Sequence, residues 1–139
     1  MPRKITSIAR DIAKFAPTED GNWRRLDDLL DELCGAGGPG QAIPEMLSVF
    51  ERYPEEDGYG VMWSLVHGLE KLPNYEPALL LSLARQPSEL GIAMVGRMLN
   101  SGVTEIGGVS LLQTLQDIAS TATSPHIREA AHSVASRPR

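Results

Sequence analysis

The sequence is poor in residues on which many small proteins depend. Of its 139 residues only one, Cys34, is a cysteine, and only 5% are aromatic. A single cysteine excludes an internal disulfide and any zinc cluster built from several cysteines, which fits a reducing compartment. Because no histidine or basic residue lies near Cys34 in the sequence, we expect a half-buried helical residue rather than a reactive thiol. Aliphatic side chains must supply most of the packing.

Long apolar stretches are also missing. The longest, residues 77–84, falls far below the ~20 residues that a bilayer-spanning helix needs. The N-terminal segment has two basic residues but neither a continuous apolar core nor a small-residue cleavage site, so it does not resemble a secretory signal. We therefore expect a cytoplasmic protein that does not associate with membranes.

Positive charge is scarce in one part of the chain. The net charge is −5, and between Glu19 and Asp57 eleven acidic residues stand against three arginines, whereas the remainder is weakly basic. Nucleic-acid binders rely on lysine and arginine to neutralise phosphates. This balance therefore argues against nucleic acid as a partner and favours a basic protein.

Patterns that carry chemistry are few. The three histidines form no metal-binding spacing, and His67 with Glu70, at i and i+3, is only half of the paired motif that a di-iron bundle requires. The glycine-rich run at residues 35–40 lacks the preceding strand and the following Lys-Ser/Thr of a phosphate-binding loop. We therefore expect no metal, no cofactor, no small-molecule substrate and no enzymatic activity.

Apolar residues at helical spacing are what the sequence does contain, and no period-two alternation predicts strands. Residues 109–135 are the clearest case. Leu111, Leu112, Leu115 and Ile118 are expected on the buried stripe of one helix, and Ser124 followed by a proline marks the start of the next. Other helices are expected over about residues 6–15, after Asn22, and over 42–53, 57–72, 75–85 and 88–100, the last being the most buried.

About eight helices predict an all-α fold of stacked antiparallel hairpins, as in HEAT-like α-solenoids or α-α superhelices. Three hairpins begin near residues 42, 75 and 109, a spacing of about 33 residues that is typical of helical repeats, although the residues themselves do not repeat. Each hairpin leaves an apolar face uncovered, so stacking creates the continuous core. We expect one domain over residues 1–139, in which residues 1–40 form capping helices and residues 41–139 the three hairpins.

Two clusters of side chains are candidate partner-binding residues. On the helix after Asn22, carboxylates fill the face opposite the apolar stripe and no lysine separates them. A charged face of this kind is usually only solvated, but four like charges repel one another, which is more easily explained if a basic partner docks there. The first cluster comprises Asp27, Asp28, Asp31 and Glu32; the second comprises Glu55, Glu56, Asp57, Tyr59, Trp63, His67 and Glu70.

The second cluster has two interpretations that the sequence leaves open. In one, Trp63 packs across the groove between adjacent hairpins and His67 makes a buried hydrogen bond to Tyr59 or to a backbone carbonyl. In the other, these three side chains lie on an exposed groove rimmed by the acidic residues 55–57, as aromatic anchors do at protein interfaces.

A resemblance to a known family is carried by about residues 55–102. Their pattern is Asp57-Gly58-x-Gly60, then Trp63, His67 and Glu70, then Pro73 to Pro77, then Arg85-x-Pro87-Ser88-Glu89. It resembles small α-helical immunity proteins of bacterial polymorphic-toxin and contact-dependent growth inhibition systems. The resemblance implies a cytoplasmic protein that binds a cognate toxin domain and blocks its active site or substrate-binding surface.

Three functions are compatible with these observations. The favoured one is a non-catalytic inhibitor, a monomer or weak dimer when free. It holds a basic, nuclease-type toxin domain through its acidic, aromatic-containing surface. The second is a generic HEAT-like adaptor that recognises another protein through the concave face of the stack. The third is a small hydrolase in which His67 and Glu70 act as acid and base.

Overall fold

The computed structural model describes residues 3–139, and over this range the fold is all-α, as expected. Eight α-helices, two 3-10 helices and one short β-hairpin are found among these residues. The α-helices are α1 (Ile5–Lys14), α2 (Arg24–Gly35), α3 (Ile43–Arg52), α4 (Val61–Glu70), α5 (Glu76–Arg85), α6 (Glu89–Asn100), α7 (Leu111–Thr121) and α8 (Pro125–Ala135). The others are η1 (Pro39–Ala42), η2 (Gly58–Gly60), β1 (Glu105–Ile106) and β2 (Val109–Ser110).

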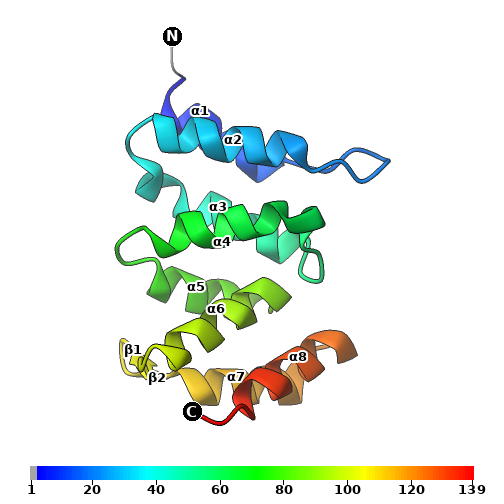
Figure 1. Cartoon of the computed structure of the whole chain (residues 1–139), viewed down its shortest axis with the longest axis vertical. Coiled ribbons are helices and arrows are strands. Elements are labelled where there is room, and N and C mark those ends of the chain that lie inside the picture. The colour runs from blue at the N-terminus through cyan, green and yellow to red at the C-terminus, as the bar shows by residue number, and fades with distance from the viewer. Residues whose placement is uncertain (1–2) are drawn as a thin grey trace.

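The helices stack along the long axis of the molecule, from α1 and α2 at one end to α7 and α8 at the other (Figure 1). On one side α1 contacts α3 and α3 contacts α5; on the other α2, α4, α6 and α8 contact one another in that order. The expected pairs, α3 with α4, α5 with α6 and α7 with α8, are also in contact. The all-α class is confirmed, whereas the assignment to HEAT-like solenoids stays a prediction.

Aliphatic side chains fill a core that runs through the stack from Ile8 in α1 to Val134 in α8. The apolar stripe predicted for α2 is buried, and α6 has seven buried residues, more than any other helix of residues 3–139. None of the helices in this range combines the length and apolarity that a bilayer crossing needs.

Three of the eight α-helices of residues 3–139 begin with a serine whose side chain caps the helix, namely α6, α7 and α8. Ser124 caps α8 by accepting a hydrogen bond from the Ile127 amide, and Pro125 is the first helical residue, as predicted. Asn22, predicted to cap α2, lies one residue before the N-cap position, although its Oδ1 accepts a hydrogen bond from the Arg24 amide at 2.8 Å. Helix α4 begins at Val61, later than the expected residue 57, because Gly60 before it adopts a left-handed conformation with φ +90°.

Three expectations for the C-terminal part were wrong. Strands were not expected, yet Ile106 pairs with Val109 in a β-hairpin whose turn is Gly107-Gly108. Val109 was therefore assigned to a helix in error. Leu112 is 40% exposed rather than buried, because it lies about 100° around the helix from Leu111, which begins the buried stripe.

Candidate binding groove between α2 and α4

Helices α2 and α4 pack side by side and leave a groove of about 460 Å³. Residues three or four apart share one face of a helix, so each helix contributes one row of side chains to the groove. The row from α2 is Asp27, Leu30, Asp31 and Cys34, and the row from α4 is Ser64, His67, Gly68 and Lys71. Leu33, Met46 and Leu72 complete the lining.

The groove carries more negative than positive charge. Asp27 and Asp31 line one wall, while Lys71 is the cation on the other. Within residues 3–139 neither aspartate belongs to an ion pair. Asp28 is exposed on the same helix but does not line the groove. The two aspartates are therefore available to a cationic group that enters from outside.

Glu32, the last member of the acidic cluster, faces α1 instead. Its carboxylate accepts hydrogen bonds from Arg3, which also forms an ion pair with Asp11. The hydrogen bond from Arg3 is the main cause that lowers the pKa of Glu32 below its ordinary value, against the opposing effect of desolvation. Glu32 thus links α2 to the N-terminal segment and is separated from the groove by this pairing.

Glu70 is likewise engaged in the fold. Its two carboxylate oxygens accept hydrogen bonds from Nε and Nη2 of Arg97, at 2.8 and 3.1 Å, which connect α4 to α6. This pairing raises the pKa of the Arg97 guanidinium. Glu70 therefore lies beside α6 and not in the groove that His67 lines.

The structure decides between the two interpretations for His67. Its side chain is exposed, so a buried hydrogen bond is wrong. Trp63 is half-buried against the core, and its ring centroid lies 6.2 Å from that of His67. The backbone of Tyr59 forms part of η2. Its side chain lies outside the described part of the chain, so the prediction that it lines a groove concerns a side chain that the structure does not describe.

Residues 55–57 lie in the connection from α3 to α4, at the opposite end of α4 from Lys71 (Figure 1). All three are exposed. The Asp57 carbonyl accepts hydrogen bonds from the amides of Gly60 and Met62, which fixes the turn into α4. The structure thus brings Asp27, Asp31 and His67 together and places Glu55, Glu56 and Asp57 at another end of the helix.

Cys34, Ser64 and Lys71 line the groove but were not among the predicted site residues. Helical spacing could have found them, because they lie three or four residues from Asp31 or His67. The expectation that Cys34 is half-buried was wrong, since its side chain is exposed at the end of α2.

The arrangement does not assemble the acid–base pair of the hydrolase hypothesis. His67 faces the α2/α4 groove, whereas Glu70 is held by Arg97 on α6. In residues 3–139, no group of three or more histidine, cysteine, aspartate or glutamate side chains is placed to hold a metal ion. The groove presents two carboxylates and an imidazole above apolar side chains. The carboxylates can bind the charged end of a lysine or arginine, and the apolar side chains can contact its aliphatic stem.

No family model matches the chain, and no curated protein or solved structure matches it at a significant level.

Proposed function

We propose that this protein is a stoichiometric inhibitor of the immunity-protein type, which binds a basic toxin domain in the cytoplasm at the α2/α4 groove and catalyses no reaction. The observation that carries the proposal is that two carboxylates with no ion pair among residues 3–139 line the same groove. Glu32, Glu51 and Glu70 each contact an arginine, whereas Asp27 and Asp31 have no such partner within residues 3–139.

Leaving these two aspartates without a cation has a cost. They are four residues apart on α2, where like charges destabilise an isolated helix by ~0.2–0.5 kcal/mol. A lysine or arginine of the partner between them would remove this repulsion and form charge-assisted hydrogen bonds. An acidic groove would also accelerate the encounter with a basic protein.

The resemblance of residues 55–102 to immunity proteins supports a toxin domain as the partner, and the α2/α4 groove is the docking site that we propose for it. The half-buried ring of Trp63 beside His67 offers an apolar contact next to the charged groove. Aromatic contacts surrounded by charge are common at the centre of protein interfaces.

Co-expression with a toxin domain encoded next to this chain tests the proposal. The wild-type protein should protect the cells, and the purified pair should bind in calorimetry with an affinity that falls as salt rises. The double variant Asp27→Asn/Asp31→Asn should weaken binding at least ~10-fold and reduce its salt dependence.

Asp28→Asn is the matched control, because it removes the same charge from the same helix outside the groove. It should change the affinity by no more than about twofold. Binding should also slow alkylation of Cys34, the only cysteine of the chain. Equal effects of the Asp27/Asp31 and Asp28 changes, or unchanged alkylation in the complex, would contradict the assignment of this groove.

The adaptor remains the second candidate, because a separate apolar groove lies between α5 and α7. An adaptor would bind its partner without abolishing the partner's activity. Protection of cells from a co-expressed toxin therefore discriminates the two functions.

A further inference from the structure

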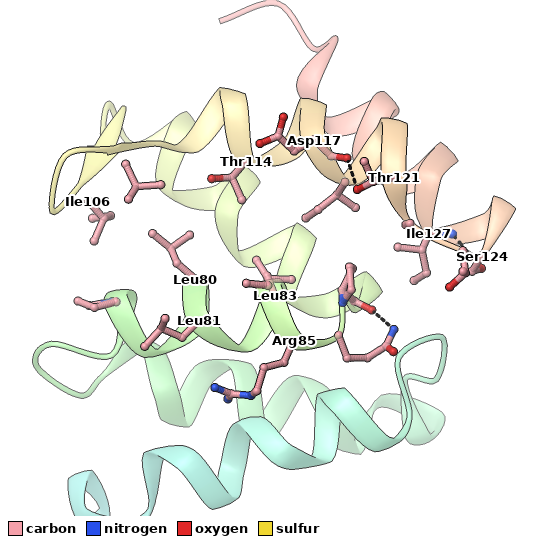
Figure 2. A pocket seen from close by; sticks show the side chains of 18 of the residues that line it. Leu80, Leu81, Leu83, Arg85, Ile106, Thr114, Asp117, Thr121, Ser124 and Ile127 are labelled. Carbon is pink, nitrogen blue, oxygen red and sulfur yellow. Dashed lines mark hydrogen bonds between the residues drawn. The ribbon is translucent and has the colours of Figure 1, made fainter.

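One layer of the stack is interrupted between α5 and α7. Whereas α1, α3 and α5 pack in succession, α7 packs on α6, α8 and β2, and a groove of about 750 Å³ opens between α5 and α7 (Figure 2). The β-hairpin lies at one end of the groove, near Ile106, and the turn before α8 lies at the other, near Ser124. The groove therefore follows the direction of the two helices.

Apolar side chains dominate the lining. They come from α5, the hairpin and α7, and include Leu80, Leu81, Leu83, Ile106, Val109 and Ile118. Leu81 is 63% exposed and Val109 46% exposed, and they are two of the three large apolar side chains that residues 3–139 expose to solvent. Covering them would be favourable by ~25 cal/mol for each Å² of apolar surface removed from water.

Several polar groups in the lining already have partners within the protein. The Thr114 hydroxyl donates to the Ser110 carbonyl at 2.9 Å, and the Thr121 hydroxyl donates to the Asp117 carbonyl at 2.7 Å. Arg85 extends away from the groove toward α3, where it binds Glu51 through two nitrogens (Figure 2). Small-molecule sites usually offer convergent polar groups. This lining instead suits an occupant that buries apolar surface.

The charged residues at the rim of the groove indicate the sign of the charge that the occupant carries. The carboxylate of Asp117 on α7 is exposed and accepts one hydrogen bond from Gln113, and the exposed Glu105 lies beside Ile106. Of the nearby cations, Arg85 is neutralised by Glu51, whereas Arg128 lies at the other end of the groove, where it donates to the carbonyls of the lining residues Ala122 and Thr123 and keeps its charge. The rim near the hairpin is thus acidic and complements a basic side chain.

We propose that this groove binds an amphipathic helix of another protein, whose apolar residues at i, i+3 or i+4 and i+7 enter the groove and whose lysine or arginine faces Asp117. The walls α5 and α7 have 10 and 11 residues, which corresponds to about 15 Å and accommodates two to three turns. Such a helix continues the layer of α1, α3 and α5. The proposal does not depend on the α2/α4 groove.

Selection of peptides from a phage-displayed library of random sequences of about 16 residues tests the proposal. The selected peptides should share the apolar spacing and a basic residue, and should become helical on binding. Leu81→Lys and Val109→Lys should each weaken their binding at least ~10-fold by fluorescence anisotropy. Leu112→Lys is the matched control: Leu112 is also exposed but does not line the groove, so affinity should stay the same.

The charge contact has its own test. Asp117→Lys should weaken binding of the selected peptides, and replacing their basic residue by glutamate should restore it. The Asp27→Asn/Asp31→Asn variant should bind these peptides as the wild type does, so failure here is distinguishable from failure of the proposed function.

Other occupants would overturn the proposal. If the protein dimerises in sedimentation experiments and Leu81→Lys makes it monomeric, a second copy fills the groove. If an apolar dye binds there but no peptide is selected, the groove is a small-molecule site. Peptides without helical spacing, or equal binding to wild type and Leu81→Lys, would also overturn it.

Discussion

The indole of Trp23 lies so close to Gly58 that a Cβ atom at position 58 would come within 2.8 Å of the ring atom Cδ2. Trp23 is buried between Phe15 and Tyr53, with ring centroids 5.4 and 5.1 Å away. The contact joins the connection before α2 to the connection before α4. In the Asp57-Gly58-x-Gly60 pattern, Gly58 therefore has a structural role that requires no partner.

Replacing Gly58 by alanine should destabilise the fold by about 1–3 kcal/mol, because the new methyl group would displace a buried ring. Urea unfolding measures the change. Gly107→Ala is the control, since Gly107 has a similar φ, +56° against +60°, but nothing within 4 Å of an added Cβ. Both variants carry the cost of a left-handed alanine. If they lose equal stability, the contact with Trp23 contributes nothing.

Glu70 is expected to act in stability rather than in partner binding, because both of its carboxylate oxygens are held by Arg97. Glu70→Gln should lower the free energy of unfolding by ~0.2–1 kcal/mol, the range for partly exposed ion pairs. The affinity for a toxin domain should remain unchanged in calorimetry. Weakened binding with unchanged stability would instead place Glu70 in the interface, as the sequence pattern suggested.

Acid should remove a stabilising contribution of Glu51. Its pKa lies below the ordinary value of 4.5, mainly because Arg85 donates hydrogen bonds to it; burial opposes this effect and Ser82 adds to it. The unfolded chain therefore binds a proton more readily, so the contribution is present above about pH 4.5 and is lost as the pH falls through the folded-state pKa.

Glu51→Gln should consequently be less stable than the wild type at neutral pH, and the difference should shrink on acidification below pH 4.5. Urea unfolding across this range measures it. Glu129→Gln serves as the control, because Glu129 is exposed on α8. A stability difference for Glu51→Gln that does not change with pH would contradict the role of the ionised carboxylate.

Local signals were sufficient to predict the helices. Apolar spacing located them, and a serine followed by proline at residues 124 and 125 gave the start of α8. The β-hairpin was missed because strands of two residues show no alternation. Its Gly107-Gly108 turn, with φ of +56° and +81° between Ile106 and Val109, was the signal that could have revealed it.

The candidate site was only partly predictable, because the state of each carboxylate depends on distant residues. Glu32 is paired with Arg3, 29 positions away, and Glu70 with Arg97, 27 positions away. Helical periodicity places all these carboxylates on polar faces but does not say which arginine reaches them. The contacts of α2 with the N-terminal segment and of α4 with α6 engage Glu32 and Glu70, whereas Asp27 and Asp31 line the α2/α4 groove.

The close approach of α6 and α8 depends on Gly96. An added Cβ there would come within 2.8 Å of Cγ1 of Val134. On an exposed helix, glycine to alanine would be stabilising by about 1 kcal/mol. Here Gly96→Ala should destabilise by about 1–3 kcal/mol because it overpacks a buried contact. Adding Val134→Ala should make room for the methyl group, so the double variant should be more stable than the sum of the single changes predicts.

Denaturation of the two single variants and the double variant measures this coupling, and strictly additive effects would contradict the close contact.

The same variants probe the α5/α7 groove. Because α7 packs on α8, a displacement of α8 from α6 would move one wall of that groove. Gly96→Ala alone should therefore weaken the binding of the selected helical peptides, although neither Gly96 nor Val134 lines the groove. The double variant Gly96→Ala/Val134→Ala should bind them as the wild type does.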